Sequence, residues 1–244
     1  MTSLETFITV HDQDLVLAAE ASGQFTSLGK YRYLFVGDGP TEKLSEINAV
    51  VSRDYPVHRE ALSDFYDFTG WRTLANYDIV KVDITLMLQY DHAVLDPDAA
   101  AKVVKSIDGH GVLATVPGYF DNWVLQLPGF GEYLQAGAKA CGVDLDSLAP
   151  FNKWPSTQGI AFTKDVLYSF MTWFEPAFDV FKDHVFAGHL AERMVWVYCH
   201  SRDIPVAYLE GLFQHGSLDC HGTGDFMRGD MRGYESKRAL FARK

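Results

Sequence analysis

The chain has 244 residues with a formal net charge of −11, and 48% of the residues are hydrophobic, enough for a sizeable core. So acidic a surface repels phosphate backbones and disfavours unaided binding to nucleic acid. Three Cys are too few for a disulfide framework, no apolar run is long enough to span a membrane, and the N-terminus lacks the pattern of a signal peptide. We therefore expect a soluble, cytoplasmic protein.

Strand and helix patterns alternate in the first half of the chain. Residues 6–10 ("TFITV") and 31–36 ("YRYLFV") are typical of strands, and a short helix is predicted between them. The turn signal "GDGP" follows, and then helix-prone sequence over 42–50 and from 58 towards 74. Residues 76–91 again favour a strand. This alternation predicts an α/β fold with a mostly parallel central sheet flanked by helices.

The second half of the chain differs from the first in its residue composition. Residues 109–131 are rich in Gly, Pro and aromatic residues and predict loops with short strands. Residues 159–162 predict a strand followed by an aromatic helix, and 183–199 predict a further helix. From residue 222 the tail is basic and Gly-rich, and we expect a peripheral helix there. No internal repeat or linker divides the chain, so one domain is predicted.

The polar residues His11, Asp12 and Asp91 stand where predicted strands end. In parallel sheets, ligands bind outside the carboxyl ends of the strands, so we expect these side chains to share a site. The carboxylate of Asp91 is a ligand type that Mg²⁺ and Mn²⁺ prefer, and Gln89, two residues earlier, can point to the same side. The alternative is that Asp91 only marks a strand-to-turn boundary.

The segment "AGHLAERMVWVYC" carries a candidate general base. On a helix, His189, Glu192 and Trp196 share one face because they are three and four residues apart. Burial in an otherwise apolar helix would raise the pKa of Glu192, which suits a base. The alternative is that Glu192 only pairs with Arg193 or another Arg at the helix surface.

A Gly-flanked segment, "LFQHGSLDCHG", holds His215, Asp219, Cys220 and His221. Their spacing matches no established zinc site. A simpler hypothesis is that one imidazole, from His215 or alternatively His221, joins a metal already held by Asp91. The alternative is that these are polar loop residues.

In their order along the chain, these segments resemble a GT-A glycosyltransferase. "TFITVHD" is similar to the first strand of that family's nucleotide-binding half, and "QYD" stands where the family has its acidic strand-end motif. "TQGIAF" resembles the Gly-containing strand of the acceptor half. "AER" stands at the position of the x-E-D motif that supplies the base in inverting members, and "FQHG" places a His beyond it.

The resemblance implies one glycosyltransferase domain over 1–244, with a nucleotide-binding half at 1–95, an acceptor-side half at 96–222 and a peripheral tail at 223–244. It also implies a nucleotide-diphosphate sugar donor, a divalent cation (Mn²⁺ or Mg²⁺) and an acceptor hydroxyl, with a glycan in surface polysaccharide synthesis as the default. The residues it assigns are His11, Asp12 and Gln89 for the donor nucleotide, Asp91 and His215 for the metal, and Glu192 for the acceptor proton.

Three rival functions fit parts of the sequence. A phage-type glycosyltransferase acting on modified DNA bases keeps the fold; the net charge opposes it, and the basic tail from Arg228 favours it weakly. A non-catalytic nucleotide-sugar binding protein fits the missing second Asp of the metal motif. A metal-dependent hydrolase would use the residues His189, His215, Asp219 and His221.

Overall fold

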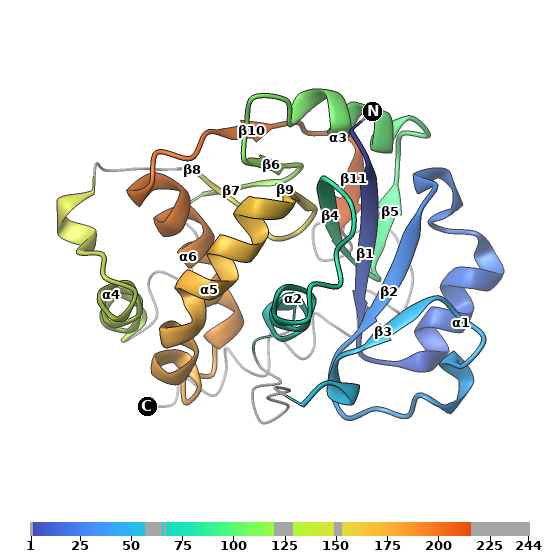
Figure 1. The fold of residues 1–244 in the computed structure, drawn as a ribbon, viewed down its shortest axis with the longest axis horizontal. Coiled ribbons are helices and arrows are strands. Elements are labelled where there is room, and N and C mark those ends of the chain that lie inside the picture. Colours follow the sequence, from blue (N-terminus) through green and yellow to red (C-terminus); the bar gives the residue numbers. More distant parts are fainter. Residues whose placement is uncertain (1, 57–64, 66, 120–128, 149–152, 216–244) are drawn as a thin grey trace.

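The computed structural model describes residues 2–56, 65, 67–119, 129–148 and 153–215. Its centre is a seven-stranded sheet (Figure 1). The strands, in spatial order, are β10 (Val206–Tyr208), β6 (Val112–Ala114), β9 (Ile160–Thr163), β4 (Ile84–Gln89), β1 (Leu4–Val10), β2 (Tyr31–Phe35) and β3 (Ala49–Val51).

The central sheet is mostly parallel, as the sequence predicts. β1 pairs in parallel with β2 and β4, β2 with β3, and β10 with β6. β9 alone runs antiparallel, between β4 and β6. β1 and β4 are buried along almost their whole length, which explains why neither alternates strictly between apolar and polar residues.

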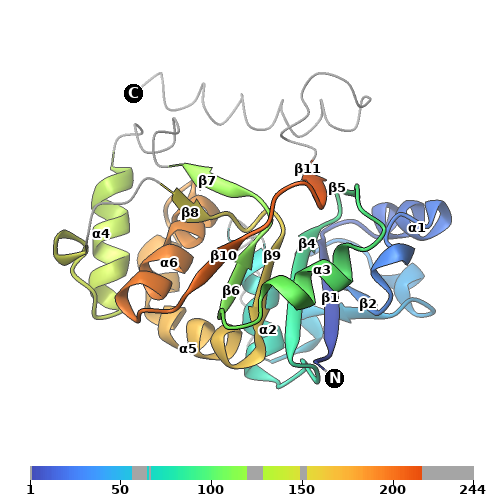
Figure 2. The same cartoon turned by 90° about the horizontal axis from the view of Figure 1, so that it is seen from above.

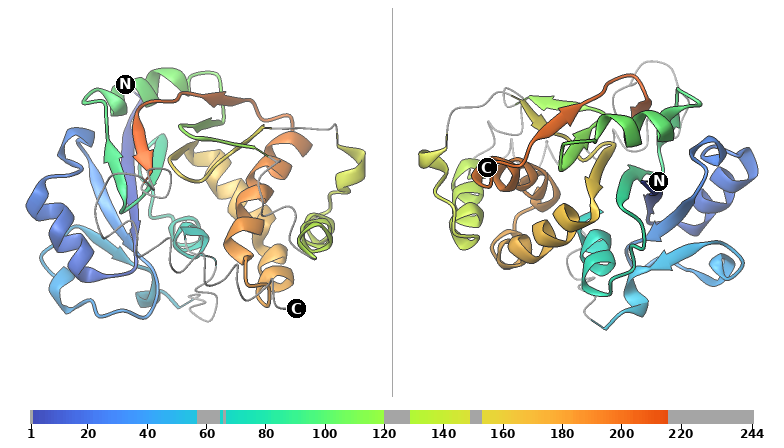
Figure 3. Two further views of the ribbon diagram at one scale, coloured as in Figure 1. Left: turned by 180° about the vertical axis from the view of Figure 1, so that it is seen from behind. Right: turned by 45° about the horizontal axis from the view of Figure 1, so that its top comes forward.

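Helices cover both faces of the sheet, and each face has its own apolar core (Figures 2 and 3). One core is built against α1 (Gln13–Ser22) and α3 (Ala99–Ser106). The other, rich in aromatic rings, is built with α2 (Asp67–Asn76), α4 (Phe130–Ala140), α5 (Lys164–Phe181) and α6 (Ala187–Ser201). In the described part of the chain, no helix is long and apolar enough to cross a bilayer.

Two small antiparallel sheets complete the fold. β5 (His92–Val94) pairs with β11 (Phe213–His215), and β7 (Pro117–Tyr119) pairs with β8 (Lys153–Pro155). Figure 2 shows both near the end of the central sheet where β4 leads into β5. They therefore add backbone at the edge where the sequence predicts a site.

Two first-half predictions were wrong in detail. The helix predicted at 42–50 is only a 3₁₀ turn at Glu42–Leu44, and the strand β3 follows it. The β-branched residues of β3 pair with β2 and extend the sheet, and this pairing overrides the helix propensity of the segment. The strand predicted from residue 76 begins at Ile84 instead, because a turn with Asp78 at φ 47° comes first.

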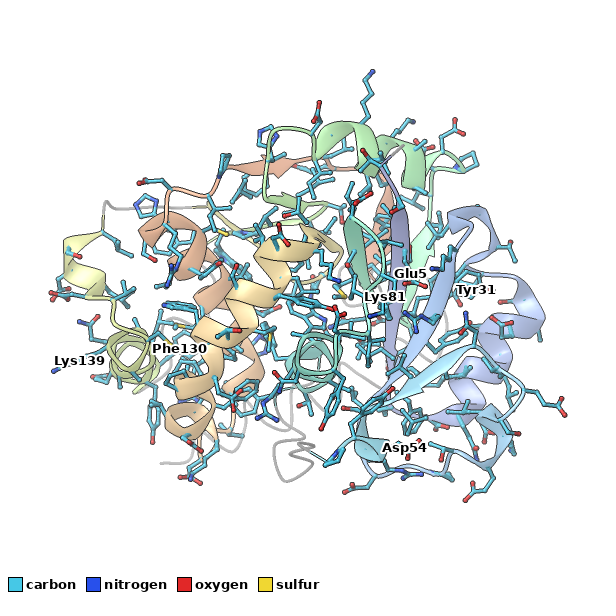
Figure 4. All side chains as sticks on the ribbon, viewed as in Figure 1. Glu5, Tyr31, Asp54, Lys81, Phe130 and Lys139 are labelled. Carbon is cyan, nitrogen blue, oxygen red and sulfur yellow. The ribbon has the colours of Figure 1, made fainter. Side chains whose placement is uncertain are left out.

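In the second half, the predicted strand at 159–162 is β9 and the aromatic helix after it is α5. The helix predicted at 183–199 is α6, which starts later, at Ala187. Residues 130 and 131, expected in a loop, begin α4. Figure 4 shows α4 with Phe130 on its buried side and Lys139 on its exposed side. The predicted tail from 222 lies outside the described residues.

Candidate functional site

The carboxyl ends of β1 and β4 lie side by side, with Thr9 opposite Gln89 in the parallel register. The amide of Tyr90 donates to the carbonyl of Thr9 (3.0 Å), so the two chains stay together one residue further. Beyond that point the ring of His11 meets the ring of Tyr90 edge to face, with centroids 5.3 Å apart. The structure therefore brings His11 to the turn that carries Asp91, as the strand ends predict.

Asp12, also predicted at this site, caps helix α1. Its Oδ1 accepts a hydrogen bond from the backbone amide of Asp14 (2.8 Å). Such a cap satisfies one of the first amides of the helix, which have no partner within the helix. Asp12 is exposed beside His11. Its structural role is thus visible, and contact with a nucleotide stays a prediction.

The "GDGP" turn after β2 packs against the backbone of His11. Gly37 has a φ of +89°, a conformation that favours glycine. A Cβ on Gly39 would lie 2.8 Å from the carbonyl oxygen of His11, so only glycine allows this approach. Arg53 donates to the carbonyl of Gly39 (2.8 Å) and to the hydroxyl of Thr41 (2.6 Å). The turn is therefore fixed at the edge of the site.

Asp91 lies in the tight turn between β4 and β5, and its side chain is 5% exposed. The turn closes around the buried ring of His92, whose Nδ1 lies 3.1 Å from the amide nitrogen of Gln89 and 3.7 Å from Oδ1 of Asp91. From the other side, Nε2 of Gln24 donates to the carbonyls of Tyr90 (3.0 Å) and His92 (2.7 Å). These contacts therefore hold the turn that carries Asp91 in place.

His215, the predicted metal partner of Asp91, comes to the same turn through the small β5–β11 sheet (Figure 2). Its backbone lies opposite that of His92, the residue after Asp91. The fold thus brings together two residues that are far apart in the sequence. The alternative ligand His221 lies outside the described residues, as do Asp219 and Cys220.

The side chain of Gln89 is hydrogen bonded to an acid that sequence reasoning missed. Nε2 of Gln89 donates to Oδ2 of Asp67, the first residue of α2, at 2.7 Å. Asp67 is only 4% exposed. Burial raises the pKa of its carboxyl to about 6, and the nearby charge of Glu192 acts in the same direction. The sequence offers one sign of this buried acid: Asp67 stands among aromatic residues, and the structure shows that two of them, Phe65 and Phe68, are buried.

Glu192 lies on α6 with three hydrogen-bonding neighbours. Its Oε1 accepts from the hydroxyl of Thr157 (2.6 Å), and its Oε2 accepts from Nη1 of Arg193 (2.7 Å). Oε2 also lies 3.3 Å from Nδ1 of His189, as the shared helix face predicts. The side chain is 13% exposed.

The expected rise in the pKa of Glu192 was wrong. Burial does raise it, but the hydrogen bond with His189 and the charge of Arg193 outweigh burial and lower the pKa to about 2. The pairing of Glu192 with Arg193, the alternative weighed from the sequence, therefore exists. Glu192 is ionised throughout the neutral range.

Asp67 and Glu192 lie close enough at this edge for the charge of Glu192 to act on the pKa of Asp67. Asp67 reaches Gln89 from α2, and Glu192 reaches the segment between β8 and β9 through Thr157. The two carboxyl groups have different surroundings, and their pKa values are shifted in opposite directions, upward for Asp67 and downward for Glu192. Such divergence within one cluster is typical of functional sites, although ion pairs that only stabilise a fold produce it too.

Among the residues that the structure describes, no group of three or more His, Cys, Asp or Glu side chains could hold a metal ion. His189, which a hydrolase would use, is turned to Glu192 instead. A metal at Asp91 would therefore need ligands from the substrate or from water, as Mg²⁺ commonly uses in phosphate-binding sites.

No known protein-family model matches the chain, and no curated protein matches it in sequence. Solved structures do match the chain in fold. The WbbM bifunctional glycosyltransferase aligns over 88% of this chain and 45% of its own length, with 10% identity and a TM-score of 0.52. The chain thus spans less than half of WbbM. This chain has the GT-A glycosyltransferase fold.

Two further solved structures with this GT-A fold match less closely. Glucosyl-3-phosphoglycerate synthase from Mycobacterium tuberculosis, in complex with Mg²⁺ and UDP, covers 88% of this chain and 71% of its own, with 12% identity and a TM-score of 0.43. The galactosyltransferase LgtC, in complex with donor and acceptor sugar analogues, covers 84% and 73%, with 13% identity and a TM-score of 0.46. The fold assignment rests on the alignment with WbbM, and at 10% identity that likeness shows the fold alone.

Proposed function

We propose that this protein is a glycosyltransferase that uses a divalent cation to move a sugar from a nucleotide-diphosphate sugar to an acceptor hydroxyl. One observation carries the proposal: the GT-A fold gathers His11, Gln89, Asp91 and the backbone of His215 at one edge of the sheet. These residues come from three segments of the chain and include an acid and a His that could serve as metal ligands.

The donor set fits a hard cation. The Asp91 carboxylate and, from the neighbouring strand, the His215 imidazole would hold Mn²⁺ or Mg²⁺, with diphosphate and water oxygens completing the coordination. When bound, the cation would neutralise negative charge that develops on the leaving diphosphate. His11, Asp12 and Gln89 would line the nucleotide pocket on the same edge.

Glu192 is the candidate proton acceptor on the acceptor side. It is ionised at neutral pH, so it can accept a hydrogen bond from an incoming hydroxyl. A carboxylate with a pKa near 2 is a weak base, and its basicity would rise when a substrate displaces the partly exposed His189 from it. The acceptor itself we propose to be a glycan hydroxyl in surface polysaccharide synthesis.

The test is thermal-shift screening against UDP, GDP, CMP, TDP and ADP, each with Mn²⁺ and with EDTA. A ligand that binds only the folded state raises the melting temperature. We expect one nucleotide to stabilise the protein in Mn²⁺ only, and Asp91→Ala to abolish that gain. The matched control is Asp98→Ala, an exposed acid beyond the turn. If no nucleotide stabilises the protein in either condition, the proposal is wrong.

A further inference from the structure

A buried histidine lies in the turn that connects α5 to α6. The backbone amide of His184 donates to the carbonyl of Phe181, the last residue of α5 (2.8 Å), and the amide of Ala187, the first residue of α6, donates to the carbonyl of His184 (3.0 Å). The side chain adds a third contact, because the amide of Phe186 donates to Nδ1 of His184 at 3.1 Å. One residue therefore joins the end of one helix to the start of the next.

The contact with Phe186 fixes the protonation state of this imidazole. A backbone amide can only donate a hydrogen bond, so Nδ1 must offer its lone pair, and the single proton of the neutral ring lies on Nε2. A second proton would have to go to Nδ1, where it would point at the amide hydrogen of Phe186. Protonation of the ring and this hydrogen bond therefore exclude each other.

The surroundings of His184 also favour the neutral ring. The residue is 7% exposed, and its ring centroid lies 4.5 Å from that of Tyr133 on α4 and 6.2 Å from those of Phe130 and Phe186. Burial lowers the pKa of His184, and no acid among the described residues opposes that effect.

The charged groups of the three helices around this turn leave an imidazolium without a partner. α4 packs against both α5 and α6 (Figure 1). The titratable and charged side chains near His184 are the exposed Glu132, Tyr133 and Lys139 on α4, the exposed Asp179, Lys182 and Asp183 at the end of α5, and His189, Glu192 and Arg193 on α6. Of these, the buried carboxylate of Glu192 already binds Arg193.

We propose that the hydrogen bond between His184 and Phe186 is a proton-sensitive latch: the neutral imidazole holds the start of α6 in place, and protonation releases it. Phe186 is the N-cap residue of α6, and its phenyl ring cannot cap the helix with a hydrogen bond. When Nδ1 carries a proton, the amide of Phe186 loses its partner and the ring becomes a buried charge. Both are costly, and opening of the turn to water removes both costs.

The latch lies one contact away from the candidate site. The ring of Phe186 lies 5.8 Å from that of His189, whose Nδ1 is 3.3 Å from Oε2 of Glu192. Loosening the first turn of α6 would therefore separate His189 from Glu192 while the rest of the fold stays intact. This consequence for the site rests on the proposed function, whereas the latch itself does not.

The first test compares the pH dependence of stability in wild type and His184→Asn. The introduced Oδ1 can accept from the amide two residues further on, as in an Asx turn, but it takes no proton. The unfolded imidazole binds a proton below about pH 6.5 and the folded one resists it, so wild type loses stability relative to the variant as the pH falls. In urea unfolding, the ratio of the folding equilibrium constants, wild type over variant, should fall about tenfold between pH 7.5 and pH 5.

The matched control is His200→Asn. His200 is an exposed residue of α6 whose ring stacks on Trp196, with centroids 4.8 Å apart. The corresponding ratio for this variant should change by less than about threefold over the same pH range.

Hydrogen exchange locates the effect in the chain. In wild type, the protection factor of the Phe186 amide should fall about tenfold between pH 7.5 and pH 5, while the amides of β1 and β4 keep theirs. In His184→Asn, the protection of Phe186 should not depend on pH, because the acceptor cannot be protonated.

A pH-independent stability ratio, or an equal loss of Phe186 protection in wild type and variant, would overturn the latch. If His184→Asn does not fold, the ¹⁵N resonances of the His184 ring in wild type decide the question. A ring that stays neutral down to pH 5, or that takes up a second proton while Phe186 stays protected, overturns the latch. Uptake of the proton together with lost protection supports it. A failed nucleotide screen would remove the proposed function and leave the latch standing.

Discussion

The guanidinium of Arg193 donates to the carboxylate of Glu192 at 2.7 Å and lies 4.0 Å from the centre of the Trp154 ring. Arg193 is 1% exposed and also donates to the carbonyl of His189 (3.1 Å). A full positive charge is therefore buried on α6, with the Glu192 carboxylate and the Trp154 ring among its neighbours. This arrangement keeps Glu192 ionised and fixes its position at the candidate site.

Replacing Arg193 by Lys should destabilise the protein by about 2–4 kcal/mol, because an ammonium cannot stack flat on an indole and leaves the buried carboxylate with a poorer partner. Urea unfolding at pH 7 measures the loss. The control is Arg202→Lys: Arg202 is exposed over the ring of Tyr198 at 5.3 Å, and its change should cost less than about 1 kcal/mol. Equal losses in the two variants would contradict the structural role of Arg193.

Asp67 should make the folded protein less stable as the pH rises. Its pKa is about 6 when folded and near 3.8 when unfolded, so the folded state binds the proton more tightly. Stability from this group is then present below pH 4 and lost as the pH rises towards 6, by about 3 kcal/mol. Glu192 acts in the opposite direction, because its pKa is lowered from 4.5 to about 2 by folding and its stabilising effect is complete only above pH 4.5; this contribution is common to wild type and to a variant at position 67 and cancels in their comparison.

Asp67→Asn removes this titration. The stability of the variant relative to wild type should therefore increase by about 2.5 kcal/mol between pH 4 and pH 7. Urea unfolding of both proteins at the two pH values measures the difference. An unchanged difference would mean that the Asp67 carboxyl has an ordinary pKa in the folded protein.

The strand ends of the site could be predicted because local pattern and topology act together. A β-branched run that stops at polar residues marks the end of a strand, and parallel pairing then places His11 beside the turn of Asp91. β3 and α4 could not be predicted in the same way. β3 exists through its pairing with β2, and α4 contains two glycines and is stabilised by burying residues such as Phe130 and Leu134.

The chemistry of the site was harder to predict than its place. Asp67 belongs to it only because the first residue of α2 meets the last residue of β4, and no local pattern in the sequence predicts that contact. The predicted direction of the pKa shift of Glu192 was wrong for a different reason. Its partners His189 and Arg193 are close in sequence, but an Arg beside an acid usually points to solvent, and here it is buried.

Gln24 should control the metal-dependent response without being a ligand. Its amide donates to two carbonyls of the turn around Asp91. Gln24→Ala should cost about 1–2 kcal/mol of stability and reduce the Mn²⁺-dependent rise in melting temperature caused by nucleotide, because the turn loses its brace. Gln135→Ala, which loses one exposed contact with Asp144, should change neither. A full nucleotide response in Gln24→Ala would show that the turn is rigid without it.

Gly137 on α4 packs directly against the ring of Phe181 on α5. A Cβ at this position would lie 2.1 Å from the ring of Phe181, which is fully buried and has little room to move. Gly137→Ala should therefore destabilise the protein by about 1–3 kcal/mol despite the better helix propensity of Ala. At Gly131, in the same helix, an added Cβ would enter open space, with no neighbouring atom within 4 Å. Gly131→Ala should therefore be neutral or stabilising by up to about 1 kcal/mol. Urea unfolding of the two variants measures both effects, and a loss of stability in both, or in neither, would contradict this close packing of α4 against α5.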